Sequence, residues 1–495
     1  MSAPLRALPP APALLLALAL AAPVTAVAQS PAGGVEALPI SMVLGIENLE
    51  LPGGEAMGLA GGTLLFDAGG GWALGPAVYG AVTGQRGGFL VGGIALQRSF
   101  ALSPGWNLAA QFYAGGGGGG AAPQGSGLML RPSLTLFHDL TPTLQLGLSA
   151  SYVSFPSGQI DSGQIGLALA WRSEFLHLRS AGVDAGASSA GASMGLGFDR
   201  MAALASVYDF RDDSGRRVGL VGARADRRSS VEGLRWGLEA SAAAQGDAAG
   251  YMEILGSVSY SVAPAPVAFP DWQLGARGGL GVGGGGAVPT GGGLLGKLSA
   301  TSEWRFAPGW TLGGEVGGVA SATGGFRALQ GQLWLATALE PDPDERASGA
   351  TVRNEWVGAW LHYQDVARVD GSSGSLDLIG LKLNRYLGPN LYVSGQAYSA
   401  FAGGAGGFSV GLVGAGLAAQ AAEQLRVGAE LLVGAAGGGG VQTAGGAVLQ
   451  GQLWAGYSPV PQHEWRVGVG GVRSFSGALS SPLFELSWAR VFELR

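Results

Sequence analysis

The sequence predicts an all-β fold in which antiparallel strands, grouped in three repeated units, close into a barrel. Three observations predict it. Apolar and polar residues alternate with period two along many segments, no comparable helical periodicity is visible, and a glycine-rich motif recurs at long intervals. The chain has 495 residues, of which 92 are glycine and 13% are charged, with a formal net charge of -6. This balance indicates neither a basic nucleic-acid surface nor an acidic disordered tail, so we expect no nucleic-acid partner.

The N-terminus is predicted to be an export signal. Arg6 precedes the apolar run 13–22, and the small residues 26–28 form a cleavage site. We therefore assign residues 1–28 to a signal peptide and 29–39 to an N-terminal segment. The apolar run is too short to span a bilayer as a helix. Cysteine is absent, so this exported chain must be stabilised by backbone hydrogen bonds or a large core instead of disulfides.

The strands are predicted from alternation. Segments 144–152, 165–172, 298–306 and 425–431 each carry apolar residues on one face and polar or small residues on the other. The segment 376–384 changes the phase of its apolar residues, which suggests a bulge. The final strand ends in Leu494 and Arg495 instead of a terminal aromatic residue.

Glycine runs begin at Gly117, Gly283 and Gly437, and each is followed by a strand-like segment. The first two copies align closely, so that Arg131 matches Lys297. Recurrence at one position of a repeat favours a glycine-packed strand end that passes into a hairpin loop. A disordered linker is the alternative interpretation.

These repeats divide the mature chain into β repeat unit 1 (40–175), unit 2 (176–345) and unit 3 (346–495), each with about eight strands. In the first unit, short and long turns alternate, which places them at opposite ends of the sheet. Each unit could close alone, or all three could form one barrel of roughly 24 strands. We expect one large barrel because the joins between units are short and lack the composition of flexible linkers.

Strands of about ten residues with one apolar face, in an exported chain, resemble the bacterial outer-membrane β-barrel proteins as a broad class, with no specific family recognised. A closed barrel is also one of the two structures that satisfy every backbone group within lipid. The resemblance implies a transmembrane barrel in the cell outer membrane, with membrane lipid and the barrel-assembly machinery as partners. Several tryptophans are expected to lie either in belts at the membrane interface or in ordinary packing contacts, and they are Trp72, Trp106, Trp171, Trp304, Trp310, Trp334 and Trp488.

The polar face of the strands would line the barrel interior. The candidate lumen-lining residues are Arg131, Arg172, Arg235, Glu239, Glu253, Arg277, Glu303, Arg305, Glu315, Lys382, Arg426, Glu430, Arg466 and Glu485. We expect them to line a water-filled channel for polar solutes or an exported polymer such as a polysaccharide. In the alternative they pair across adjacent strands and fill the interior, giving a plugged structural or binding barrel that displays short surface loops to a partner.

The sequence indicates no catalytic, metal-binding or nucleotide-binding site. His138, His177, His362 and His463 are scattered without ligand spacing, and the acidic residues of 340–345 lack the pattern of a calcium loop. No nucleotide-binding loop or nucleophile elbow is recognisable. We therefore expect no enzyme activity, no metal and no cofactor. A secreted soluble β-repeat is a further hypothesis, in which the apolar face would have to be buried against another sheet.

Overall fold

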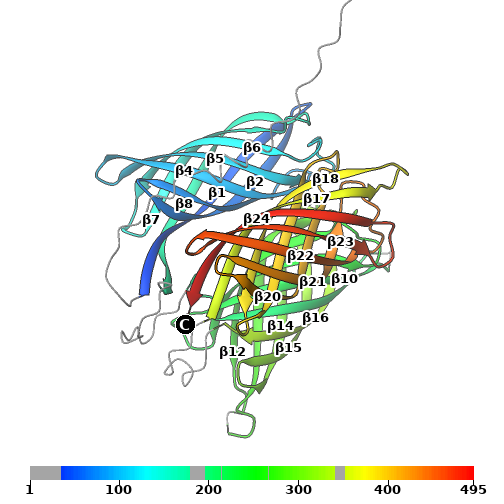
Figure 1. Cartoon of the computed structure of the whole chain (residues 1–495). Helices are drawn as coiled ribbons and strands as arrows, with labels where there is room; N and C mark the ends of the chain where they lie inside the picture. The colour runs from blue at the N-terminus through cyan, green and yellow to red at the C-terminus, as the bar shows by residue number, and fades with distance from the viewer. Residues whose placement is uncertain (1–34, 179–194, 213–214, 266, 340–351, 495) are drawn as a thin grey trace, which may run out of the picture.

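This computed structural model describes residues 35–178, 195–212, 215–265, 267–339 and 352–494. The predicted signal peptide and the acidic segment 340–345 lie outside the described residues. All regular elements within those ranges are β-strands, which confirms the predicted all-β class. No helix among the described residues is long and apolar enough to cross a membrane. The 24 antiparallel strands form three closed barrels of eight strands each (Figure 1).

Barrel 1 is closed by its first and last strands, which pair from Val35↔Leu178 to Glu47↔Gly166. Its strands are β1 (Val35–Leu51), β2 (Glu55–Gly69), β3 (Trp72–Ala81), β4 (Leu90–Ser103), β5 (Trp106–Gly118), β6 (Met129–Asp139), β7 (Leu144–Ser154) and β8 (Asp161–Leu178).

Barrel 2 is closed in the same way, with pairs from Ala328↔Phe210 to Ala338↔Arg200. Its strands are β9 (Arg200–Phe210), β10 (Arg217–Arg228), β11 (Leu234–Gln245), β12 (Met252–Val262), β13 (Trp272–Gly284), β14 (Leu294–Ala307), β15 (Trp310–Ser321) and β16 (Arg327–Ala338).

Barrel 3 is closed by pairs from Val352↔Leu494 to Tyr363↔Leu483. Its strands are β17 (Val352–Ala367), β18 (Ser373–Tyr386), β19 (Leu391–Ala402), β20 (Ser409–Ala422), β21 (Leu425–Gly437), β22 (Ala447–Val460), β23 (His463–Ser474) and β24 (Ser480–Leu494).

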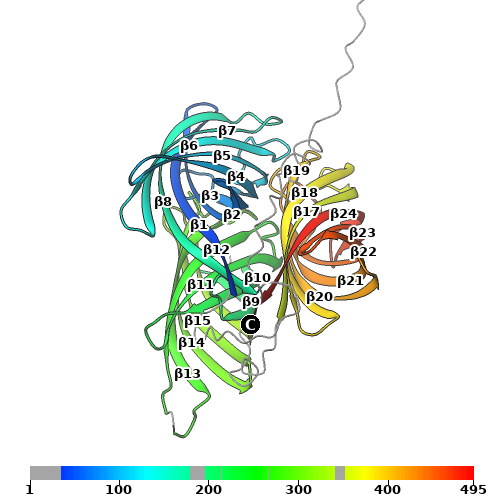
Figure 2. The ribbon, with the colours of Figure 1, turned by 60° about the vertical axis from the view of Figure 1, so that its left-hand side comes forward.

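The prediction of one large barrel is wrong. Between barrels 1 and 3, strand pairing is limited to the single pair Glu493↔Leu178, whereas each barrel's own closing strands pair along most of their length. Closure within a unit leaves no strand edge for the next unit to extend. The short joins fit this arrangement equally well, because an even number of strands returns the chain to the end of the barrel where it began. Figure 2 shows the three barrels as separate rings of strands.

Alternating residues point inward and outward along each wall. In β6, Arg131, Ser133 and Thr135 are buried inside barrel 1, while Leu134 is exposed on the outside. In β14, Lys297 is buried at the position that the repeat assigns to it, and Leu298 is exposed. The outward surface of the barrels is therefore apolar, and the polar side chains of the strands point inward, as period-two patterning requires.

The two ends of each barrel differ. One end, here called the short-turn end, carries most of the tight hairpins and the first and last strand residues of each barrel. The opposite end, the glycine-loop end, carries most of the longer loops. The exposed tryptophans lie beside the short turns, and they are Trp72, Trp106, Trp171, Trp236, Trp272, Trp304 and Trp310.

One of the tryptophans predicted for a belt is placed differently. Trp334 is 2% exposed because it points into barrel 2, where the guanidinium groups of Arg200 and Arg224 lie over its ring. Trp488 is half-buried on the outward face beside the short β22–β23 turn, where it stacks on His463. Period-two alternation by itself cannot distinguish the two faces of a strand when a tryptophan occupies the polar one.

Each barrel contains three inward layers. An apolar cluster fills the glycine-loop end, and includes Leu59 in barrel 1, Leu255 in barrel 2 and Leu378 in barrel 3. A smaller apolar or aromatic cluster lies near the short-turn end, with Phe137 and Trp454 as examples. The buried charged side chains lie between the glycine-loop cluster and the short-turn end, some at the level of the smaller cluster and others, such as Asp226, beyond it.

Candidate functional site: the barrel interiors

Barrel 2 holds a buried charge network centred on Asp226, which is 0% exposed. Its carboxylate lies 2.8 Å from Arg200 Nη2, 3.3 Å from Arg224 Nε and 3.2 Å from Arg277 Nη1. Glu315 lies opposite, 3.5 Å from Arg277 and 3.8 Å from Arg224. These side chains come from β9, β10, β13 and β15, so the network crosses the barrel and ties distant strands together.

A second group fills the same barrel toward the glycine-loop end. Lys297 Nζ lies 2.6 Å from Glu239 Oε1. Glu253 accepts hydrogen bonds from the hydroxyls of Tyr208 at 2.6 Å and Tyr251 at 2.7 Å. Because charges removed from water are costly unless they are paired and hydrogen-bonded, these partners are what makes the burial of the carboxylates tolerable.

Barrel 3 also contains buried carboxylates that are paired with arginine side chains. Glu355, 0% exposed, accepts from Arg426 Nη1 at 3.1 Å and from Arg466 Nη2 at 2.6 Å. Glu464 accepts a further hydrogen bond from Arg426 at 3.2 Å. Arg466 also lies over the ring of Trp454, with its guanidinium carbon 4.4 Å from the ring centroid. This part of the interior is thus filled with paired ions and aromatic rings.

Lys382 forms the centre of a second network in barrel 3. Its Nζ lies 2.5 Å from Glu485 Oε2 and 3.2 Å from Glu430 Oε2. Gln452 Nε2 donates to both carboxylates at 2.8 Å, and the Tyr392 hydroxyl donates to Glu430 at 2.8 Å. One ammonium group therefore bridges two carboxylates, and neutral donors supply the remaining hydrogen bonds.

Barrel 1 is less filled. Its interior has one bidentate pair, in which Arg131 Nε lies 2.9 Å from Glu47 Oε1 and Nη2 lies 2.8 Å from Oε2. Ser151 donates to the same carboxylate at 2.7 Å. Beside the pair is a cavity of about 40 Å³, large enough for roughly three water molecules. Its polar lining includes Gln97, Gln111, Ser133, Thr135 and Ser149.

The predicted site residues fall into two groups. Three lie at the short-turn rim: Arg172 pairs with Asp139 at 3.2 Å, Arg235 with Asp199 at 2.9 Å, and the exposed Arg305 with Asp271 at 2.7 Å. The others are buried in the interiors, and they are Arg131, Glu239, Glu253, Arg277, Glu303, Glu315, Lys382, Arg426, Glu430, Arg466 and Glu485.

Sequence reasoning missed several partners in these networks. The missed residues are Glu47, Arg200, Arg224, Asp226, Glu355 and Glu464. A signal existed for some of them, because Arg224 and Asp226 alternate within β10 and therefore share a face. Glu464 alternates with Arg466 in the same way. Glu47 was harder to recognise, since its inward neighbours on β1, Gly45 and Leu49, are not polar.

The four histidines do not come together. His138 stacks against Trp106 near a short turn, His362 bonds to Asp377 at 2.8 Å, and His463 lies against Trp488. Across the described ranges, no group of three or more metal-binding side chains is positioned to hold a metal ion.

No protein-family model matches the sequence, and no curated protein matches it. Among solved structures, the chain is similar to several proteins of Pseudomonas aeruginosa, including the following three. The outer membrane protein OpdK matches at 11% identity and a TM-score of 0.22, covering 92% of this chain and 99% of that one. OccK2 in complex with glucuronate matches at 12% and 0.21, covering 93% and 98%. The siderophore receptor PirA matches at 12% and 0.27, covering 94% and 81%.

TM-scores of this size do not establish a shared topology, so the class follows from the chain's own architecture. Closed barrels with an even number of antiparallel strands, apolar outward faces, polar interiors and tryptophans gathered beside the short turns are the features of outer-membrane β-barrels. The closed eight-stranded barrel occurs three times in the described residues, and the exposed tryptophans belong to barrels 1 and 2.

Proposed function

We propose that this protein is an outer-membrane assembly of three β-barrels whose interiors are plugged, and that it serves as a structural or binding element and not as a wide channel. The observation that carries the proposal is the set of ion-pair networks that, together with the apolar clusters, fill the interiors of barrels 2 and 3. An eight-stranded barrel is just wide enough for its own side chains. This proposal excludes the passage of an exported polymer, which would require one large lumen.

The outward surface supports the membrane setting. Ile165 is 70% exposed, Leu298 69% and Leu333 67%, and each points away from its own barrel. In water such a surface would be an aggregation hazard, whereas in lipid it is the preferred contact. The lipid of the outer membrane and the barrel-assembly machinery are therefore the partners that we propose.

The test is single-channel recording of the mature chain, refolded in detergent and inserted into a planar bilayer. We expect no large, long-lived conductance steps from a sample that is shown to be folded by its heat-modifiable migration on a gel. Large ohmic steps from such a sample would contradict the proposal. Co-flotation of the same sample with lipid vesicles shows that the chain is inserted.

A second candidate function is a narrow passage for water or small ions through barrel 1. It is favoured by the polar cavity beside the Arg131–Glu47 pair and by the small inward residues of that barrel. In this hypothesis the ion pair is the constriction. Arg131→Ala should then give a small, cation-preferring conductance, because Glu47 remains without its partner. Glu430→Gln in barrel 3 is the matched control and should leave the current unchanged.

A further inference from the structure

The three glycine loops have the same conformation. Each begins with a tight turn in which the N–H of the third residue after a glycine approaches that glycine's carbonyl. Ala122 N donates to Gly119 O at 3.0 Å, Val288 N to Gly285 O at 3.0 Å, and Val441 N to Gly438 O at 3.1 Å. Gly438 in the third loop is equivalent to Gly285 in the second, because both accept the same hydrogen bond. Ala436, and not Gly437, is therefore the structural equivalent of Gly283, one position earlier than the sequence alignment predicts.

Each of these loops follows the fifth strand of its barrel and packs on the turn after the third strand of another barrel. The loop of barrel 2 meets the β3–β4 turn of barrel 1, where Gly87 N donates to Gly291 O at 2.6 Å. A Cβ atom on Gly292 would lie 2.6 Å from Thr83 Cα, so the two backbones touch without room for a side chain.

The loop of barrel 1 makes the equivalent contact with the β19–β20 turn of barrel 3. Gly407 N donates to Gly117 O at 3.1 Å, and Gln124 Nε2 donates to Gly406 O at 3.0 Å. A Cβ atom on Gly116 would lie 2.6 Å from Ser399 O. Glycine is therefore required for close backbone approach here, and not for flexibility.

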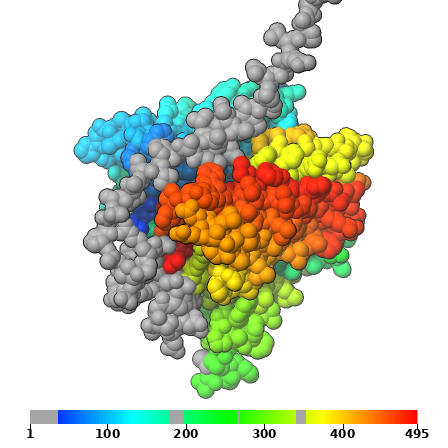
Figure 3. Space-filling view, in the orientation of Figure 1, coloured from blue at the N-terminus to red at the C-terminus, as the bar shows by residue number. Residues whose placement is uncertain are grey.

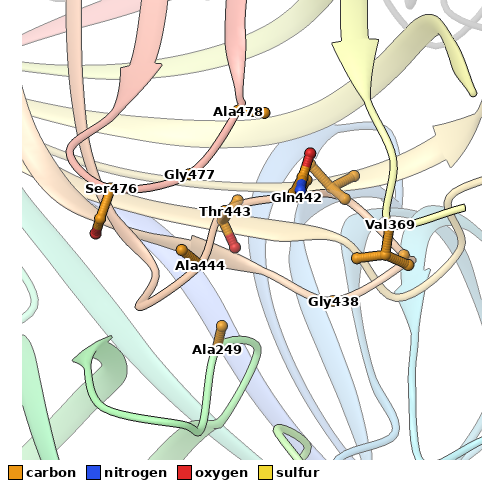
Figure 4. Close-up of a pocket in the computed structure, with 11 residues that line it drawn as sticks. Ala249, Val369, Gly438, Gln442, Thr443, Ala444, Ser476, Gly477 and Ala478 are labelled. Atoms are coloured by element: carbon orange, nitrogen blue, oxygen red, sulfur yellow. The ribbon is translucent and has the colours of Figure 1, made fainter. Parts of the chain in front are cut away.

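The loop of barrel 3 meets the β11–β12 turn of barrel 2, which completes the cycle. A Cβ atom on Gly437 would lie 2.2 Å from Gly250 N. A recess of about 660 Å³ lies beside Ala249, between that turn and the glycine loop of barrel 3 (Figure 4). Figure 3 shows barrel 3 in contact with barrel 1 on one side and with barrel 2 on the other.

We propose that the chain is a tandem trimer: each eight-stranded unit acts as a protomer, and the three glycine junctions close a head-to-tail ring that holds the barrels together without the covalent joins. The same loop meets the same turn three times, which is the geometry of a heterologous interface that closes on itself. This inference is independent of whether any lumen conducts.

The ring makes a specific prediction about broken junctions. Loss of one junction leaves every barrel attached through the other two, whereas loss of the two junctions of barrel 2 leaves it held by small contacts, in which Gly195 N donates to Leu176 O at 2.8 Å and Arg385 donates to Leu339 O. Barrel 2 is the one to release, because barrels 1 and 3 also pack through aromatic side chains, with Phe66 and Trp356 ring centroids 5.0 Å apart and Phe175 and Phe492 4.8 Å apart.

The experiment places protease sites in both joins, between Leu178 and Gly195 and between Leu339 and Val352. The full chain is folded, cut in detergent and passed over a size-exclusion column. We expect the cut wild type to elute as one particle. Gly292→Val or Gly437→Val alone should not release a fragment, whereas the double variant should lose barrel 2 and retain barrels 1 and 3 together. Gly325→Val is the control, since a Cβ atom there meets nothing within 4 Å.

Heat-modifiable migration of each fragment shows whether its barrel is folded. If valine prevents folding, Gly87→Ala with Gly437→Ala replaces the pair, because a methyl group at Gly87 would already lie 2.3 Å from Thr290 Oγ1. Dissociation of the cut wild type would overturn the proposal, and so would a folded double variant from which barrel 2 is not released.

Discussion

Asp226→Asn tests whether the buried networks stabilise their own barrel. The substitution keeps the shape of the side chain but leaves Arg200, Arg224 and Arg277 without the carboxylate that lies 2.8 to 3.3 Å from each of them. Removing one partner from a buried ion pair typically costs about 3–5 kcal/mol, because the remaining charge stays desolvated. Arg224 is 1% exposed and Arg277 2%, so water cannot replace the lost partner without opening the barrel.

The assay is hydrogen–deuterium exchange of the full chain in detergent, read separately for peptides from each barrel. A loss of 3 kcal/mol accelerates exchange from globally opened β9–β16 by roughly a hundredfold or more, since every 1.4 kcal/mol is a factor of ten. Barrels 1 and 3 serve as internal references and should exchange as in the wild type. Asp271→Asn, which removes the exposed pair with Arg305, should cost no more than about 1 kcal/mol. Exchange of barrel 2 within about threefold of the wild type would refute the reasoning.

Three further predictions follow from single residues. Ala287 has a φ of 55°, so Ala287→Gly should slow the unfolding of barrel 2 in urea by relieving roughly 1 kcal/mol of strain, whereas a destabilised variant would contradict this. Tyr208→Phe removes a hydrogen bond to the buried carboxylate of Glu253 and should cost about 1.5–3 kcal/mol in the same unfolding experiment, while Tyr260→Phe on the outer face should cost almost nothing. In bilayers, lipids brominated near the headgroup should quench tryptophan fluorescence more than lipids brominated near the chain ends, because the exposed tryptophans of the short-turn end lie at the membrane interface. The reverse order would contradict an interfacial position.

The features that depend on the local pattern of residues could be predicted from the sequence. Period-two alternation identifies the inward and outward faces of β6 and β14 correctly, and the repeat predicts that Arg131 and Lys297 occupy the same position. The glycine runs were correctly interpreted as strand ends that pass into loops. These features depend on the pleat of the strand and on the backbone freedom of glycine, which neighbouring residues already determine.

What the sequence could not supply depends on pairing between distant segments. Whether β8 pairs with β1 or with a strand of the next unit depends on the closure of a whole sheet. The sequence of a single strand carries no information about that closure. The segment 376–384 illustrates a related limit. Leu376, Leu378, Lys382 and Asn384 all point inward, so the apparent phase change is a switch from the apolar layer to the charged layer inside one barrel. The register shift nearby, between Asp377 and Leu378, arises from an extra residue on β19.

The central claim is that each unit closes on itself. Because the chain contains no cysteine, it can be tested by a pair of introduced cysteines without background. Leu44 in β1 pairs directly with Leu169 in β8, and both side chains are exposed on the outside of barrel 1. Directly opposed residues have Cβ atoms about 5 Å apart, which a short bis-thiosulfonate reagent spans. The account predicts efficient cross-linking of the folded Leu44→Cys/Leu169→Cys chain and none for Leu44→Cys with Leu486→Cys on β24. Cross-linking of β1 to β24 in place of β8 would show one large barrel and contradict the account.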